Sequence, residues 1–235
     1  MTRRLLLVRH GITAWNAEGR FQGHRDPPLS DEGRAEARLL AERLRADPGE
    51  RPMRVVSSPL LRALETARLI AGDAVVVTDA GLIEIGQGEW EGRTHADLAE
   101  HDADRYRAWR SREHLRPPGA EPLETAFERS TRAIRSAIRE ADAHGTWPLC
   151  VVAHGGVMRL VAADLLEVEL AAAWPLDVDN AALCVLDERG DGWRIQRWND
   201  VLHLLRGGHA ATDDVDEQMT QRPAAAAIDD LPRAL

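Results

Sequence analysis

Short apolar segments alternate along the chain with longer stretches in which apolar residues recur at helical spacing. Residues 4–8 and 149–153 are typical of strands buried on both faces, and residues 54–57 and 74–78 are further strand candidates. The stretches with helical spacing lie at residues 31–46, at 59–71, from about 94, at 123–143 and at 157–165. This alternation predicts an α/β fold, a three-layer αβα sandwich whose mainly parallel sheet carries helices on both faces.

Capping residues and turns mark where these elements begin and end. Ser30 is a predicted N-cap, because two acidic residues follow it in the first helical turn. Ser58 is expected to cap the next helix, with Pro59 at the first helical position. Residues 182–186 and 193–198 flank a short polar turn, and they predict an antiparallel hairpin at the edge of the sheet.

The chain is long enough for one sizeable core. Of its 235 residues, 44% are hydrophobic, which favours one globular domain over two. We expect residues 1–206 to form this domain. Residues 207–235 contain six acidic residues and two arginines, and they predict a polar acidic tail without a core of its own.

Composition excludes several classes of function. All 30 residues counted as Lys or Arg are Arg, so P-loop, Schiff-base and pyridoxal mechanisms that need a lysine amine are excluded. The net charge of −9 argues against nucleic acid or an anionic membrane as partner. Cys150 and Cys184 lack the spacing of a metal site, and the apolar run near the N-terminus is too short for a signal or a membrane span. These features predict a cytoplasmic protein with no metal.

Charged side chains follow three of the predicted strands at the end where parallel sheets bind ligands. Arg9 and His10 follow the first strand, Arg62 lies just beyond the second, and His154 follows the strand at 149–153. Two guanidinium and two imidazole groups gathered in a dry site would repel each other unless an anion were bound. An ordinary ion pair would explain either arginine alone, and a structural role would explain a single histidine. The four together predict a phosphate site.

Motifs along most of the chain point to one family. They are VRHGITAWN at 8–16, Gln22-Gly23, LSDEG at 29–33, SSPLLRALETA at 57–67, Glu84 with WEG at 90–92, and HGG at 154–156. Together they resemble the histidine phosphatase superfamily, also called phosphoglycerate mutase-like. The resemblance runs from residue 4 to about residue 205 and does not extend to the tail.

The resemblance implies a mechanism through a phosphorylated histidine. His10 is implied as the nucleophile, with one ring nitrogen attacking phosphorus and the other held as N–H by a backbone carbonyl. The groups implied to bind the phosphoryl oxygens or close over them are Arg9, Arg62, His154, Asn16, Gln22, Gly23 and Gly155. No cofactor or metal is implied, because the arginines and histidines neutralise the phosphate charge.

An acid must protonate the leaving oxygen, because a bare alkoxide leaves slowly. Glu84 occupies the acid position of the family, and the same carboxylate would later take a proton from the attacking water. Glu89 and Glu91 lie nearby in the same loop and are the alternatives. Otherwise, Glu89 and Glu91 simply belong to a solvated face of the loop.

The residues after Glu84 favour the phosphatase branch of the family. Phosphoglycerate mutases of the family continue from the acid as Glu-Arg-His-Tyr-Gly and carry a lysine-containing insert, whereas this chain reads EIGQGEWEG and has no lysine. We therefore expect hydrolysis of a small phosphomonoester, with a cofactor-dependent phosphoglycerate mutase as the alternative. An inactive module that binds a phosphorylated ligand is a third possibility, against which the intact candidate residues weigh.

The substrate itself is open, although one segment bears on its charge. Arg107, Arg110, Arg112 and Arg116 either form a solvated helix face or bind an acidic substrate. Pro122 stands where the family usually has Ser, so any role of that Ser does not transfer. Three tryptophans could line the mouth of the site or belong to the core: Trp15, Trp90 and Trp109. The oligomeric state is also open, with a homodimer as one option.

Overall fold

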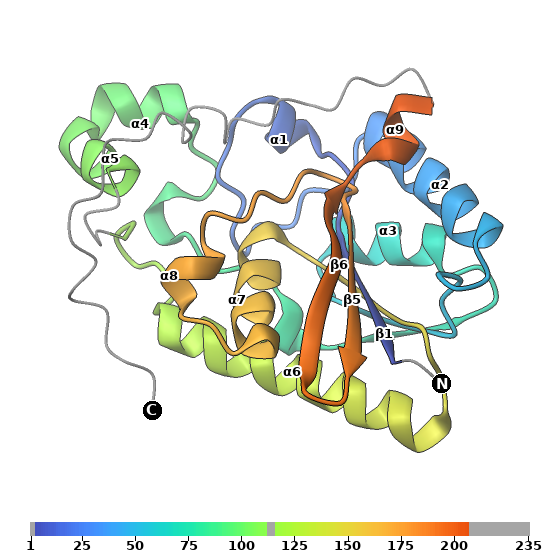
Figure 1. Cartoon of the computed structure of the whole chain (residues 1–235). Coiled ribbons are helices and arrows are strands. Elements are labelled where there is room, and N and C mark those ends of the chain that lie inside the picture. Colours follow the sequence, from blue (N-terminus) through green and yellow to red (C-terminus); the bar gives the residue numbers. More distant parts are fainter. Residues whose placement is uncertain (1–2, 112–115, 207–235) are drawn as a thin grey trace.

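The computed structural model describes residues 3–111 and 116–206 (Figure 1). A single sheet of six strands lies at its centre, in the order β3-β2-β4-β1-β5-β6. The strands are β1 (Arg4–Arg9), β2 (Arg54–Ser57), β3 (Val75–Thr78), β4 (Leu149–Ala153), β5 (Leu183–Arg189) and β6 (Gly192–Asp200). The first four pair in parallel, whereas β5 and β6 form an antiparallel hairpin beside β1. The predicted fold class is confirmed.

Helices cover both faces of this sheet. The α-helices are α1 (Ala14–Ala17), α2 (Asp31–Ala46), α3 (Leu61–Ile70), α4 (His95–His101), α5 (Ala103–Arg110), α6 (Leu123–His144), α7 (Gly155–Leu166), α8 (Leu170–Ala173) and α9 (Leu202–Arg206). Two 3₁₀ turns, η1 (Ala80–Leu82) and η2 (Gly88–Trp90), interrupt the segment between β3 and α4. Among the described residues, no helix is both long enough and apolar enough to cross a membrane.

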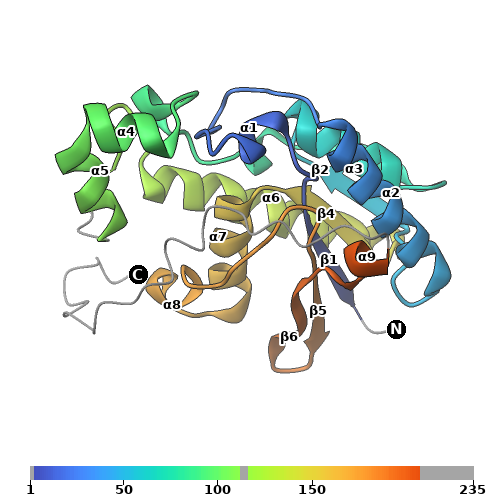
Figure 2. The same cartoon turned by 90° about the horizontal axis from the view of Figure 1, so that it is seen from above.

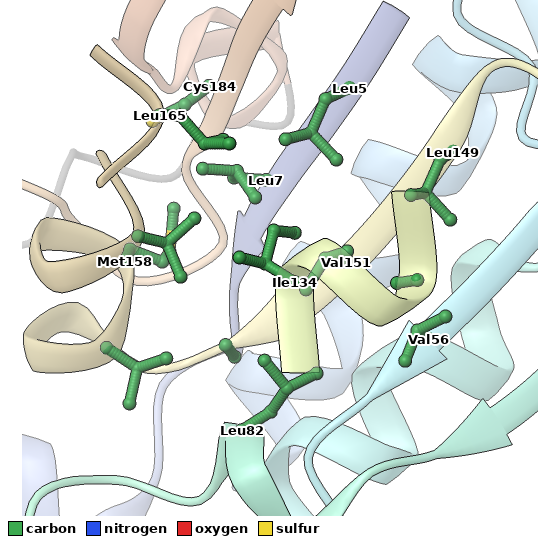
Figure 3. Close-up of a cluster of buried hydrophobic side chains, with 14 of the residues drawn as sticks. Leu5, Leu7, Val56, Leu82, Ile134, Leu149, Val151, Met158, Leu165 and Cys184 are labelled. Atoms are coloured by element: carbon green, nitrogen blue, oxygen red, sulfur yellow. The ribbon is translucent and has the colours of Figure 1, made fainter. Parts of the chain in front are cut away.

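The core divides into two clusters, because successive side chains of a strand point to opposite faces. Leu5 and Leu7 of β1 pack in one cluster with α6 and α7, and Figure 3 shows Leu7 close to Ile134 of α6. Leu6 and Val8 of the same strand pack with α2 and α3 on the other face. These four side chains are at most 1% exposed, which explains the unbroken apolar run from Leu5 to Val8.

The two predicted helix caps differ in outcome. Ser30 caps α2 as expected, since its Oγ accepts a hydrogen bond of 3.0 Å from the backbone N–H of Gly33. The prediction for α3 is wrong, because the helix begins at Leu61 and has no side-chain cap from its own N-cap residue. The Ser58 hydroxyl accepts a 3.3 Å hydrogen bond from the N–H of Leu60, before the helix, and lies next to the His154 ring. Asp26, from a distant loop, accepts a 2.6 Å hydrogen bond from the N–H of Leu61.

Helices α4 and α5 lie apart from the main sheet. Figures 1 and 2 show them on one side of the molecule, with α2 and α9 on the opposite side. Aromatic side chains hold this region together, with Trp90 buried between Phe21, Tyr106 and Trp109. Trp90 is therefore a core residue and does not line the mouth of a site.

Candidate active site

The sheet topology brings the two predicted histidines together. Strands β1 and β4 are parallel neighbours, and Arg9 pairs in register with Ala153. The residues that follow these two strands must therefore lie side by side at the carboxyl edge of the sheet. The ring centroids of His10 and His154 are 5.2 Å apart, and both rings are buried.

The ring of His10 is held with one nitrogen available. Its Nδ1 lies 2.8 Å from the carbonyl oxygen of Gly11, and a carbonyl can only accept, so Nδ1 carries the hydrogen and Nε2 has the lone pair. Burial, reinforced by the positive charges of Arg62 and Arg9, lowers the pKa of His10 well below its ordinary value. A neutral imidazole with a free Nε2 is the form that can act as a nucleophile at neutral pH.

Residues from two other parts of the chain form hydrogen bonds with the backbone of His10 and Gly11. The His10 carbonyl accepts hydrogen bonds of 3.0 Å from both the Asn180 side chain and the Ala181 N–H. On the other side, Thr66 accepts a 3.1 Å hydrogen bond from the N–H of Gly11 and donates to the Arg62 carbonyl. These contacts hold His10 between α3 and the segment that leads into β5.

Arg62 lies fully buried beneath the loop that follows α1. Its Nη1 donates to the Arg25 carbonyl at 2.7 Å, and its Nη2 donates to the Gly23 carbonyl at 3.0 Å. Burial lowers the pKa of Arg62 to about 10, which still leaves the guanidinium charged at neutral pH. Its Nε is buried and has no hydrogen-bond partner among the described residues.

His154 presents a second buried nitrogen without a partner. Its Nε2 is 2.9 Å from the hydroxyl of Ser58, whereas its Nδ1 makes no hydrogen bond within the described part of the chain. Burial, followed by the charge of Arg62, lowers the pKa of His154 well below its ordinary value. Buried polar atoms are normally hydrogen-bonded, so these unsatisfied nitrogens of Arg62 and His154 suit a bound anion.

Arg9 and Glu84 both lie at the N-terminus of α7. Arg9 donates to the Val178 carbonyl at 2.5 Å, and its Nε lies 3.7 Å from where a Cβ would stand on Gly155. The Glu84 carboxylate accepts a 3.3 Å hydrogen bond from the N–H of Gly156. A Cβ on Gly156 would lie 2.6 Å from that carboxylate, so glycine is required there for the close approach.

The remaining candidates lie in segments that border this site. Asn16 belongs to a capping box at α1, in which its Oδ1 accepts hydrogen bonds from the N–H and the hydroxyl of Thr13. The Oε1 atom of Gln22 is buried without a hydrogen bond from the described residues. Gly23 has a φ of +50°, and a Cβ there would lie 2.2 Å from the carboxylate of Glu91.

Glu89 and Glu91 are the alternatives to Glu84 as the acid, and they lie in different surroundings. Glu89 is exposed. Glu91 accepts hydrogen bonds of 2.9 Å from the N–H of His24 and 3.0 Å from the N–H of Gln87, so it joins two loops. Glu84 differs from both, because its carboxylate accepts a hydrogen bond from the N–H of Gly156, two residues after His154.

Two of the arginines before Pro117, Arg107 and Arg110, contact residues of their own helix. Arg107 pairs with Asp104 at 3.0 Å, and the guanidinium of Arg110 lies 5.9 Å from the ring centroid of Tyr106. Arg112 lies outside the described residues, and Arg116 is exposed. The contact of Arg107 agrees with the solvated-face interpretation of this segment.

Asn180, Thr66 and Ser58 were not singled out as site residues from the sequence. For Asn180 a signal was available: it precedes the predicted strand at 182–186, and an antiparallel strand starts at the edge where its parallel neighbours end. For Thr66 and Ser58 the family motif covers the positions but does not assign these contacts. No group of His, Cys, Asp or Glu within residues 3–111 and 116–206 could hold a metal ion.

The chain is similar to known proteins over most of its length. The family model of the histidine phosphatase superfamily (branch 1) matches residues 5–201. Phosphoglycerate mutase-like protein 4 of Arabidopsis thaliana is 36% identical, over 87% of this chain and 88% of its own. A metal-independent phosphoserine phosphatase of the same plant is 34% identical, over 87% and 84%. The solved structure of mycobacterial glucosyl-3-phosphoglycerate phosphatase in complex with VO3 has a TM-score of 0.74 at 33% identity, covering 84% of this chain and 98% of that one.

Proposed function

Because the chain belongs to the histidine phosphatase superfamily (branch 1) and is a phosphatase of that family, we propose that it transfers the phosphoryl group of a small phosphomonoester first to His10 and then to water. One observation carries this mechanism. His10 keeps its Nε2 lone pair free, its ring lies 5.2 Å from that of His154, and Arg62 and His154 each keep a buried nitrogen without a hydrogen bond from the described residues.

In the first step, the lone pair on Nε2 of His10 attacks phosphorus, and the bond from phosphorus to the ester oxygen breaks. Arg9, Arg62 and His154 bind the other phosphoryl oxygens and stabilise the charge that spreads over them in the transition state. Glu84 gives a proton to the departing oxygen. The hydrogen bond from the N–H of Gly156, two residues after His154, to the Glu84 carboxylate supports this role.

In the second step, water attacks the phosphohistidine and returns Nε2 of His10 to its free form. Glu84, left as a carboxylate by the first step, takes a proton from this water. Glu84 is then the acid again and inorganic phosphate is released, so the cycle balances. Such proton transfers contribute about 10²- to 10⁴-fold to a rate.

The other candidate residues shape the space around the phosphoryl group. We assign the side-chain amides of Asn16 and Gln22 as further donors, and the backbone at Gly23 as the support for the loop that Arg62 holds. Gly155 lets the N-terminus of α7 approach the substrate, since a side chain there would point at Arg9.

We propose that the substrate is acidic. Two relatives are named for phosphoserine and for glucosyl-3-phosphoglycerate, and both of these esters carry a carboxylate near the phosphate. Arg159 supports the same preference, because its Nη1 lies 3.8 Å from the Cβ position of Gly155, beside the phosphate site. Its Nε donates to the Leu176 carbonyl at 2.8 Å, which holds the guanidinium in place.

The test is phosphate release from a panel of acidic and neutral phosphomonoesters, with His10→Ala as the control. We expect acid-labile phosphate to be trapped on the protein and to be absent from His10→Ala. Faster interconversion of 2- and 3-phosphoglycerate than phosphate release would show a mutase instead. Binding of the esters without any turnover would show an inactive module.

We also propose that residues 1–206 form the complete catalytic unit and that the protein acts in the cytoplasm. The family model ends at residue 201, and burial raises the pKa of both free thiols, Cys150 and Cys184, as suits unreactive core residues. Full kcat/KM in a chain ended at residue 206 checks the first point. Localisation of a tagged chain to the cytoplasm checks the second.

A homodimer is a further proposal, supported by the edge strand β3. Val75 and Val77 on this strand are 68% and 38% exposed, and β3 has only β2 as a neighbour in the described sheet. An exposed apolar edge strand is suited to pairing with a second copy. Light scattering checks this proposal, since Val75→Lys should then give the mass of one chain.

A further inference from the structure

A largely buried ion pair lies behind the loop that carries Glu84. Arg129 of α6 faces Glu121, and their side chains are only 15% and 12% exposed. The Nε and Nη2 atoms of Arg129 each donate to one carboxylate oxygen of Glu121 at 2.7 Å. This two-point contact fixes the plane of the guanidinium group.

The other donors of Arg129 all reach backbone carbonyls of the same loop. Nη1 donates to Gly81 at 2.8 Å and to Ile83 at 2.6 Å, and Nη2 donates to the carbonyl of Glu84 itself at 3.0 Å. A guanidinium group has five N–H donors, and these five hydrogen bonds use all of them. Arg129 therefore has no donor left for a substrate, and its contacts serve to hold the backbone.

Glu121 holds the loop on the other side of Glu84. Its carboxylate accepts a 3.1 Å hydrogen bond from the N–H of Gly86, and its own N–H donates to the Gly86 carbonyl at 3.0 Å. The backbone is thus held immediately before and after the candidate acid. The Glu84 side chain then has little freedom except rotation about its own bonds.

We propose that Arg129, acting together with Glu121, is a positioning residue for the acid step. It holds the backbone from which the carboxylate of Glu84 reaches the leaving oxygen. This inference rests on the role given to Glu84 above. A general acid must come within about 2.6 to 3.2 Å of the atom it protonates, so a small displacement of this loop lowers the rate of proton transfer.

The consequence is a dependence on the leaving group. An alkoxide needs a proton as it departs, whereas the 2,4-dinitrophenolate ion is stable enough to leave without one. Loss of positioning at Glu84 should therefore slow the cleavage of alkyl phosphates and spare 2,4-dinitrophenyl phosphate. A merely structural role of Arg129 would slow both esters alike.

The experiment compares kcat/KM for glycerol 3-phosphate and 2,4-dinitrophenyl phosphate in the full chain. For this mechanism kcat/KM reports only steps up to phosphoryl transfer to His10, so the later hydrolysis does not enter. In Arg129→Lys, which cannot reproduce five hydrogen bonds, we expect kcat/KM for the alkyl ester to fall about 10- to 100-fold, as a misplaced catalytic group would cause. We expect the dinitrophenyl ester to change by less than about threefold. Glu84→Gln should show the same split with a loss of about 10²- to 10⁴-fold.

Arg135→Lys is the matched control. Arg135 lies on the same helix and forms its own two-point pair, with Asp164 at 2.7 and 2.9 Å, away from the Glu84 loop. This variant should leave both esters unchanged. Glu121→Gln keeps an acceptor for the N–H of Gly86. It should therefore lower kcat/KM for the alkyl ester selectively, as Arg129→Lys does, but to a smaller degree. If Arg129→Lys does not fold, Glu121→Gln tests the positioning role in its place.

Equal losses on the two esters in Arg129→Lys would overturn the positioning role, and so would full activity of that variant. If Glu84→Gln itself shows no split, the acid assignment under the proposed function is wrong, whatever Arg129 does. A split in Glu84→Gln that is missing from both Arg129→Lys and Glu121→Gln would overturn this inference alone.

Discussion

Arg62 and Arg107 are the same side chain placed in two contrasting regions of the molecule. Arg62 is fully buried on α3, and two carbonyls of a distant loop hold its guanidinium group. Arg107 is 75% exposed on α5, and it pairs with Asp104 only three residues earlier in the same helix. One arginine thus depends on tertiary structure for its partners, whereas the other finds its partner locally.

The difference shows how unfavourable it is to bury a cation. Burial lowers the pKa of Arg62 because removing a charge from water is unfavourable, and its Nε is left without a hydrogen bond from the described residues. A bound phosphate would offset both effects. The exposed pair at Arg107 loses little hydration and contributes about 1 kcal/mol at most to stability. We infer that unfavourable burial of a cation, more than the presence of arginine, marks the phosphate site.

Arg62→Lys tests the contrast between the two arginines, and we expect it to have the largest effect. Lysine keeps the charge but cannot hold the carbonyls of Gly23 and Arg25 while also donating to a phosphoryl oxygen. We expect kcat/KM to fall about 10²- to 10³-fold, as for loss of one transition-state donor. Steady-state kinetics measures the loss, and Arg68→Lys, an exposed position on the same helix, should change kcat/KM by less than about twofold. Similar losses in the two variants would contradict the distinction between buried and exposed arginines.

A second prediction concerns pH. The pKa values of His10 and His154 are lowered in the folded protein by burial first and nearby arginines second, so the unfolded chain takes up protons earlier as pH falls. The free energy of unfolding should therefore decrease as pH falls below the unfolded value of about 6.5. His203, whose pKa burial lowers to about 4, adds to the same trend.

Urea unfolding at a series of pH values between 7 and 5 measures this dependence. His10→Asn removes one of the contributing groups, so its unfolding free energy should decline less steeply with falling pH than that of the unsubstituted chain. Arg68→Lys changes no histidine and should keep the original slope. An unchanged slope in His10→Asn would contradict a lowered pKa at this ring.

The smallest effect is expected at α5. The double variant Arg107→Ala with Arg110→Ala removes two exposed cations that contact Asp104 and Tyr106 of their own helix. We expect kcat/KM to change by less than about twofold for both acidic and neutral esters, in keeping with the small energies of exposed ion pairs. A selective loss on acidic esters, measured with the same panel of substrates, would instead give these arginines a part in substrate recognition.

Much of the fold follows from local pattern. The apolar run at 149–153 and the segment at 54–57 coincide with β4 and β2, and Ser30 caps α2 as predicted. These features depend on neighbours within a few residues, where side-chain periodicity and capping chemistry act directly. The wrong cap at Ser58 shows the limit of this approach. Its hydroxyl is beside His154, 96 positions away, and the N-terminus of α3 is capped by a residue from another loop.

Some residues of the candidate site can likewise be found from local motifs, whereas others depend on tertiary contacts. The Arg-His-Gly and His-Gly-Gly motifs identify His10 and His154, because residues after parallel strands must gather at one edge of a sheet. Arg129 has no such local mark, and Asn180 is indicated only by its place before the predicted strand at 182–186. Their importance lies in donating to backbone carbonyls of distant segments, and any residue has a backbone carbonyl, so the sequence contains no sign of the partner.

Local patterns of polarity are thus enough to define the strands, the helices and the motif residues of this chain. Its tertiary packing alone selects the side chains that are buried with a nitrogen unsatisfied, and those that hold a loop in place through its carbonyls. The physical reason is that desolvation and backbone hydrogen bonding depend on everything that surrounds a group in space. Neighbours along the chain supply only a small part of those surroundings.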